Sequence, residues 1–133
     1  MGILKGYLLD THVLLWDMCG SPRLSQTAKT AISDVNIPKF ISPVSIYEIM
    51  YKSKIGKLQE YDYIAENFLS LLEEFGAVEL PISNSHAHYA GKMDWSHRDP
   101  FDRLLVAQAC VDDLTLITND DNISLLPWVD KLW

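Results

Sequence analysis

The chain has 133 residues, of which 48% are hydrophobic and 22% are charged. These values are ordinary for one globular domain and exclude a disordered, collagen-like or low-complexity protein. Its 11 Lys and Arg residues against 18 Asp and Glu residues give a net charge of −7, which argues against a basic protein that coats nucleic acid. We therefore expect a single domain over residues 1–133, able to bind nucleic acid only where metal ions offset a local group of carboxylates.

The cysteine content and the apolar segments indicate a cytoplasmic protein. Cys19 and Cys110 are too few for a disulfide framework and lack the spacing of a metal site. The apolar stretch over residues 3–16 is interrupted by Lys5, Asp10 and His12, so it matches neither a signal peptide nor a membrane span. We expect reduced thiols, no membrane association and a cytoplasmic location.

The first part of the chain predicts two strands, each followed by helices. The apolar run over 6–9 is typical of a buried strand, and the helix after it is short. After a break at residues 20–22, Ser25 is a good N-cap for a helix over 26–35. A second strand is expected over 39–42.

The middle of the chain predicts two helices and a third strand. Pro43 suits the first turn of a helix that Ser42 caps and that runs to about Gly56. Apolar residues at helical spacing then predict one continuous helix over 61–75, which Gly76 ends. The third strand is expected over 77–80.

The last part of the chain continues this alternation. We expect, in order, a helix from Ser83 or Ser85 through Ala90, a helix from Asp99-Pro100 to about Val111, a strand over 114–118, a short helix, and a final segment over 128–133. Alternating strands and helices predict an α/β fold with a mostly parallel sheet.

Four carboxylates stand where such a sheet binds ligands. Ligands bind beyond the carboxyl ends of parallel strands, and the crossover helices begin at that same edge. Asp10 ends the first predicted strand and Asp120 follows the fourth, whereas Glu48 and Asp102 lie in the early turns of two helices. We therefore expect these four side chains to converge on one edge of the sheet.

Each acid also has a structural explanation that ordinary frequencies favour when it is taken alone. These explanations are a helix cap for Asp10, an i,i+4 ion pair with Lys52 for Glu48, a capping box with Asp99 for Asp102, and a turn for Asp120. The convergence of all four on one edge favours a functional site. Asp99 itself is expected mainly to cap and orient the helix that it precedes.

A cluster of carboxylates predicts a metal site. Such groups repel one another and take up protons unless a cation joins them. Oxygen ligands select Mg²⁺, with Mn²⁺ as the alternative. The four histidines lack ligand spacing, so we expect none of them to bind the metal, although His97 is expected near the edge of the site. The chemistry that this arrangement allows is hydrolysis of a phosphodiester.

Three basic residues near the acids are candidate contacts for the backbone of a nucleic acid. They are Lys52, Arg98 and Arg103. The alternative for Arg103 is an ion pair with Asp99 or a neighbouring carboxylate.

Four segments of the chain resemble the motifs of PIN domains, in particular those of VapC-type toxins from bacterial and archaeal toxin–antitoxin pairs. They occur in the right order over nearly the whole chain. The segment His97-Arg98-Asp99-Pro100-Phe101-Asp102-Arg103 is highly specific. The other three are Leu8-Leu9-Asp10-Thr11-His12-Val13-Leu14-Leu15-Trp16, Ser45-Ile46-Tyr47-Glu48-Ile49 and Leu116-Ile117-Thr118-Asn119-Asp120.

The resemblance implies a fold, an activity and partners. The fold is a three-layer α/β/α sandwich around about five strands, and the activity is that of a Mg²⁺-dependent endoribonuclease. The partners are RNA, a cognate antitoxin whose tail blocks the site, and a second copy in a homodimer. The implied residues are Asp10, Glu48 and Asp102 as metal ligands, Asp120 completing the acidic pocket, and Asp99, Thr11 and Thr118 in supporting positions.

Two other functions remain open from the sequence. An Asp-nucleophile phosphatase also places an aspartate after a strand, but such enzymes have a second aspartate where this chain has His12. A PIN-like module kept only for protein binding is the other alternative, although such modules often lose site acids and this chain retains all four.

Overall fold

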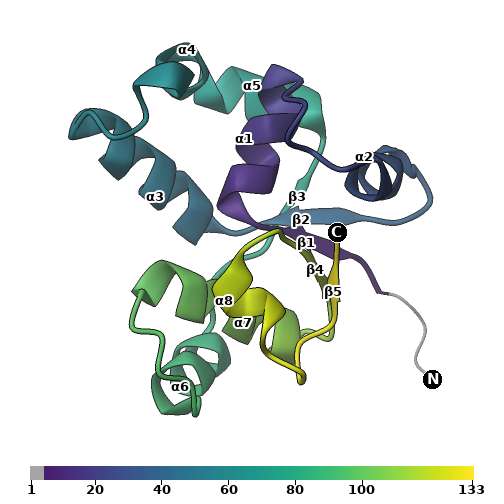
Figure 1. The fold of residues 1–133 in the computed structure, drawn as a ribbon, viewed down its shortest axis with the longest axis vertical. Helices are drawn as coiled ribbons and strands as arrows, with labels where there is room; N and C mark the ends of the chain where they lie inside the picture. Colours follow the sequence, from purple (N-terminus) through teal and green to yellow (C-terminus); the bar gives the residue numbers. More distant parts are fainter. Residues whose placement is uncertain (1–4) are drawn as a thin grey trace.

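The computed structural model describes residues 5–133 and contains one parallel sheet of five strands (Figure 1). The order across the sheet is β3-β2-β1-β4-β5, so the first strand of the chain lies at its centre. Each neighbouring pair runs parallel. The strands are β1 (Tyr7–Leu9), β2 (Lys39–Ile41), β3 (Val78–Glu79), β4 (Thr115–Ile117) and β5 (Lys131–Leu132).

Helices cover both faces of this sheet, as parallel strands require. In Figure 1, helices α1 to α5 lie above the strands, and α6, α7 and α8 lie below them. The bounds are α1 (Thr11–Cys19), α2 (Gln26–Ser33), α3 (Pro43–Lys54), a 3₁₀ turn η1 (Gln59–Tyr61), α4 (Asp62–Glu66), α5 (Phe68–Phe75), α6 (Asn84–Lys92), α7 (Pro100–Val111) and α8 (Asp121–Ser124). The three-layer α/β/α prediction is confirmed.

Alternate strand residues supply the core on the two sides of the sheet, because successive side chains of a strand point to opposite faces. Leu8 and Leu116 are paired in register and pack with the side chains of α6, α7 and α8. Leu9 and Ile117 are the next pair and pack with α1 and α2. All four side chains are fully buried, so β1 and β4 form a rigid base for the residues that follow them.

The predicted helix over residues 61–75 is wrong in one respect, because the chain leaves helical geometry at Asn67. This residue has φ −113° and ψ 18°. Its side-chain amide donates to the carbonyl of Tyr63 at 2.8 Å and its backbone N–H donates to the same carbonyl at 3.2 Å, so one carbonyl accepts both bonds where the helix is interrupted. Two short helices, α4 and α5, result, and Gly76 ends the second in the left-handed conformation, as predicted.

The second predicted helix ends two residues early. It was expected to reach Val35, but α2 ends at Ser33. The Asp34 carboxylate accepts the N–H of Asn36 at 2.9 Å, and this local turn replaces the last helical residues.

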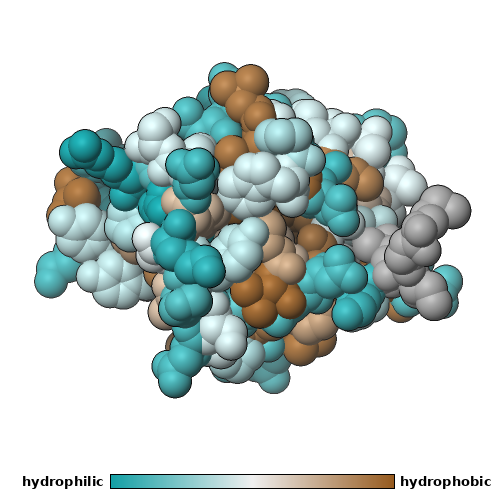
Figure 2. Space-filling view, turned by 90° about the horizontal axis from the view of Figure 1, so that it is seen from below, coloured by the Kyte–Doolittle hydropathy of each residue, from teal (hydrophilic) through white to brown (hydrophobic). Residues whose placement is uncertain are grey.

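The face of the molecule seen from below in Figure 1 is mixed in hydropathy. On the face drawn in Figure 2, hydrophobic side chains form small separate groups among hydrophilic ones. Over residues 5–133, no helix combines the length and apolar character that crossing a membrane requires.

Candidate active site

The four predicted acids meet at the carboxyl edge of the sheet. Asp10 follows β1 directly and Asp120 lies three residues after β4, while Glu48 and Asp102 belong to α3 and α7. Their charges act on one another: Glu48 and Asp120 both raise the pKa of Asp10, and Asp10 and Asp120 both raise the pKa of Asp102. The topology therefore assembles in space four side chains that are far apart in the sequence.

Asp10 occupies the N-cap position of α1 but does not cap it. Its side chain makes no hydrogen bond to the helix and instead accepts the Thr118 hydroxyl at 2.5 Å, which joins the ends of β1 and β4. Burial raises the pKa of Asp10, since the hydrogen bond from Thr118 and the charge of His12 only partly offset the loss of water. The capping explanation for this carboxylate is wrong.

Glu48 is buried and paired. Its side chain lies in the second turn of α3, with only 7% exposed, and accepts Lys52 Nζ at 2.6 Å. Burial alone would lower the pKa of Lys52, but the hydrogen bond and charge of Glu48 outweigh it, and the pKa is raised. The ion pair of the structural explanation is present, but the Glu48 carboxylate is buried at the acidic edge rather than exposed to solvent.

Asp102 lies in the first turn of α7 and contacts His97. Its carboxylate is 2.7 Å from His97 Nε2. Burial raises the pKa of Asp102 to about 6, and the charges of Asp99, Asp10 and Asp120 act in the same direction. The Asp99 carboxylate accepts the N–H of Phe101 at 2.9 Å, so Asp99 caps α7 as predicted.

Thr118 and Asp120 form a second local network. The Thr118 hydroxyl accepts the backbone N–H of Asp120 at 3.0 Å while donating to Asp10. One Asp120 oxygen accepts two backbone N–H groups at the start of α8, so the structural role of this acid is a helix cap and not the turn considered above. Behind it, Thr11 donates to the Ser45 hydroxyl at 2.9 Å and ties α1 to α3.

The acidic edge has the chemistry of a divalent-metal site. His97, Asp99 and Asp102 each offer a ligand atom within 4.8 Å of the others. The predicted trio of Asp10, Glu48 and Asp102 does not meet this spacing among residues 5–133. Lys52 and His97 contact two of those carboxylates, and burial is the largest cause of the raised pKa values of Asp10 and Asp102. Carboxylate oxygens are the donors that Mg²⁺ and Mn²⁺ prefer, so this donor set fits either ion.

The family model of the PIN domain matches residues 7–129. The chain belongs to the PIN domain family. The matched region spans all four acids and the whole sheet except β5. A comparison with curated protein sequences gives no significant match.

Solved structures of similar shape support the same PIN fold. A DNA-bound VapBC complex from Salmonella typhimurium is 17% identical with a TM-score of 0.70, and the match covers 98% of each chain. VapBC2 from Rickettsia felis, bound to a DNA fragment from its promoter, is 18% identical with a TM-score of 0.69, over 95% of this chain and 96% of that one. A toxin–antitoxin complex from Klebsiella pneumoniae is 22% identical with a TM-score of 0.67, over 93% and 95%.

Arg103 of this PIN domain has a role that the sequence did not predict. All five of its N–H donors reach backbone carbonyls, those of Ala90, Met93, Trp95 and His97, at 2.6–3.1 Å. The predicted ion pair with a carboxylate is wrong, and the predicted contact with RNA has no free donor. Arg98, another of the predicted contacts, is exposed to solvent.

His97 is the residue of the PIN site that sequence reasoning undervalued. We expected it near the edge but not among the ligating groups. The Arg103 hydrogen bonds fold the segment between α6 and α7 back onto α7, and this places the ring against Asp102. The available signal was its spacing, five residues before Asp102 and directly before the acidic segment.

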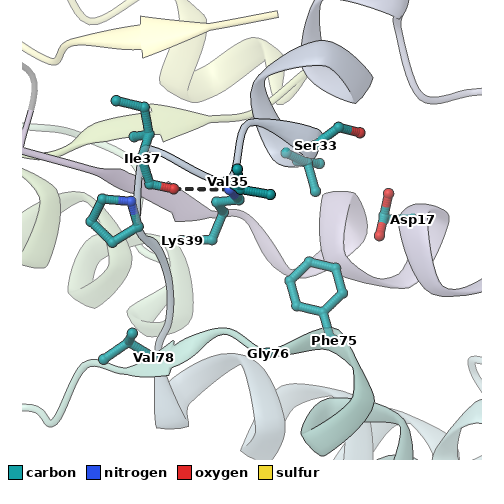
Figure 3. Close-up of a pocket in the computed structure, with 10 residues that line it drawn as sticks. Asp17, Ser33, Val35, Ile37, Lys39, Phe75, Gly76 and Val78 are labelled. Atoms are coloured by element: carbon teal, nitrogen blue, oxygen red, sulfur yellow. Dashed lines mark hydrogen bonds between the residues drawn. The ribbon is translucent and has the colours of Figure 1, made fainter.

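A cavity of about 490 Å³ lies at the edge of the sheet opposite to the four acids (Figure 3). Its walls come from the ends of α1, α2 and α5 and from the beginnings of β2 and β3. Asp17, Val35 and Phe75 face it, and the Lys39 ammonium at its rim already donates to the carbonyls of Asp34 and Ile37. It contains none of the four site acids.

Proposed function

We propose that this PIN domain is a metal-dependent endoribonuclease of the VapC type, the toxin of a toxin–antitoxin pair. The observation that carries the proposal is the group of four carboxylates at one sheet edge, two of them with pKa values raised above 3.8. An idle buried carboxylate is costly, so a fold that holds several together implies a cation and a reaction that uses it.

Asp10, Glu48 and Asp102 are the proposed ligands, with Asp120 completing the pocket. A bound Mg²⁺ supplies an activated water and positive charge for phosphodiester hydrolysis. The chain itself orients the ligands: Thr118 fixes Asp10, and the Thr11–Ser45 contact fixes α1 against α3. His97 holds its Nε2 2.7 Å from the Asp102 carboxylate and so helps to orient that ligand.

RNA, an antitoxin and a second copy of the chain are the proposed partners. The structural neighbours described above are toxin–antitoxin complexes, and this likeness supports an antitoxin for this chain. Lys52 and the exposed Arg98 lie beside the acids and offer positive charge to an RNA backbone. A cytoplasmic location fits these partners.

The two alternative functions have weaker support. A module used only for binding does not need four acids assembled at one edge. An Asp-nucleophile phosphatase does not fit the PIN family match, and His12 at the position of the second aspartate is exposed.

RNA cutting by the purified chain tests the proposal directly. We expect cutting with Mg²⁺ or Mn²⁺ and none with EDTA. Asp10→Asn, purified in parallel, controls for contaminating ribonucleases and should be inactive. Cutting that survives EDTA, or equal cutting by Asp10→Asn, would contradict the proposal.

Metal binding should weaken at acidic pH. Mg²⁺ needs deprotonated carboxylates, and Asp102, with a pKa of about 6, is charged at pH 8 but mostly protonated at pH 5. We expect the apparent Kd for Mg²⁺, measured from the rise in Tm with metal concentration, to increase about tenfold from pH 8 to pH 5. An equal Kd at both pH values would remove Asp102 from the ligand set.

A further inference from the structure

A pocket of about 250 Å³ opens directly beside two of the site acids. Asp10 and Asp120 form one wall, and the other lining residues are His12, Val13, Trp16, Arg23 and Asn119. Pockets for drug-sized ligands have volumes of roughly 300–1,000 Å³, so this one suits a smaller group. Its contact with the acids means that whatever it binds lies next to the reacting bond.

Two rings form the apolar part of this pocket. The centroids of His12 and Trp16, one helical turn apart on α1, are 5.9 Å apart with a 44° angle between the planes. The Trp16 indole is fixed from behind, because its N–H donates to the Tyr61 hydroxyl at 3.2 Å and its ring packs edge-on against Trp133. His12 is exposed, so the pocket has one fixed aromatic wall and one accessible ring.

Two polar residues of the lining, Arg23 and Asn119, have side chains that are free to bind a ligand. Over residues 5–133, the side chains of Arg23 and Asn119 are exposed and make no hydrogen bond or ion pair. An amide offers both donors and an acceptor, which is the requirement for reading the edge of a base. A free guanidinium matches a phosphate, and here it stands next to carboxylates without pairing to them.

We propose that this pocket binds one unpaired nucleobase of single-stranded RNA, next to the phosphate that is cut. Aromatic rings for stacking, a side-chain amide for the base edge and a cation for the neighbouring phosphate are the groups by which proteins recognise single-stranded RNA. This inference rests on the proposed nuclease function and adds to it a base preference at the cut position. His12 and Trp16 stack on the base, Asn119 contacts its edge, and Arg23 binds the backbone.

A double-mutant cycle between protein and RNA tests the pocket. The probes are RNA pentamers in which the linkage next to the central nucleotide is an uncharged methylphosphonate, which prevents cutting. The central nucleotide carries either a base or no base. Loss of the base should weaken binding to the wild type about tenfold. The His12→Ala variant should bind the intact pentamer about tenfold more weakly and lose little more with the abasic one.

Matched variants and probes sharpen this test. His12 is exposed, so an unchanged Tm is expected and excludes unfolding as the cause. Lys29→Ala removes an exposed cation of α2 outside the pocket and should retain the full base dependence. Pentamers with each of the four bases should show a preference that Asn119→Ala weakens. The proposal would be overturned if removal of the base weakened RNA binding equally in the wild type and in His12→Ala. It would also be overturned if the wild type bound both probes equally well. Both results are expected if the pocket instead binds a side chain of a protein partner.

Failure of this inference is distinct from failure of the nuclease. Metal-dependent cutting that Asp10→Asn abolishes, without coupling between His12 and the base, retains the nuclease and overturns the base pocket. Coupling without any cutting retains the pocket and overturns the nuclease.

Discussion

Asp102→Asn should stabilise the metal-free protein and abolish RNA cutting. The pKa of Asp102 is raised to about 6 from 3.8 by burial and by its acidic neighbours, so the folded state favours the protonated form. The stability that the protonated Asp102 adds to the folded state is fully present below about pH 3.8. It is lost as the pH rises through about 6. Asparagine is uncharged at every pH and keeps a hydrogen-bonding side chain for His97. We expect its Tm without metal to exceed that of the wild type by about 2–5 °C at pH 8 and by less at pH 5.

The same substitution removes a proposed metal ligand. Changing the groups that merely support metal ligands costs about 10–100-fold in affinity or activity, so loss of a ligand should lower kcat/KM at least about 100-fold. Thermal unfolding with EDTA and with Mg²⁺, beside an RNA cleavage assay, measures both effects. Asp62→Asn, at an exposed acid outside the site, is the control and should change neither. A less stable Asp102→Asn variant, or one that retains cutting, would contradict the assignment of Asp102.

Arg103→Ala should destabilise the protein more than any change at an exposed arginine. It removes five hydrogen bonds to the carbonyls of four residues, Ala90, Met93, Trp95 and His97. Hydrogen bonds that involve a charged group contribute about 1.5–3 kcal/mol each but do not add fully. We expect the free energy of unfolding to fall by about 3 kcal/mol and the Tm by about 10 °C.

Arg103→Lys separates charge from geometry. An ammonium keeps the charge but has three donors on a flexible stem, so it cannot reproduce the planar fork of five. We expect a loss of about 2 kcal/mol, measured by urea unfolding. Arg98→Lys, at an exposed site with no hydrogen bond among the described residues, should change stability by less than about 0.5 kcal/mol. If both lysine variants are equally stable, Arg103 does not organise the segment before α7.

The position of the acids could be predicted because it depends on topology rather than on detail. Parallel strands and crossover helices share one edge, so apolar runs and proline positions were sufficient to bring Asp10, Glu48, Asp102 and Asp120 together. Helix caps could be predicted from local sequence signals. The side chains of Ser25, Ser42 and Asp99 each accept a backbone N–H of the helix that they precede.

The features that were not predicted depend on individual side-chain contacts, which periodic patterns of apolar residues do not reveal. The helix is interrupted at Asn67, whose side-chain amide bonds to the carbonyl four residues earlier, and the spacing of apolar residues does not reveal such a contact. Arg103 was assigned to a charged partner because charge is visible in a sequence, whereas a folded-back loop that presents four carbonyls is not. His97 was undervalued for the same reason, because its place beside Asp102 depends on that loop.

The strand order divides the chain into two pieces that each carry half of the acids. β1, β2 and β3 come from residues 7–79, and β4 and β5 from residues 115–132, so the two groups meet only where β1 pairs with β4. The exposed segment Pro81–Ser83 joins them. A gene interrupted after Ile82 would encode one fragment with Asp10 and Glu48 and another with Asp102 and Asp120. Neither fragment holds the site, so cutting would report on the reunion of the two halves, as in a split-enzyme sensor.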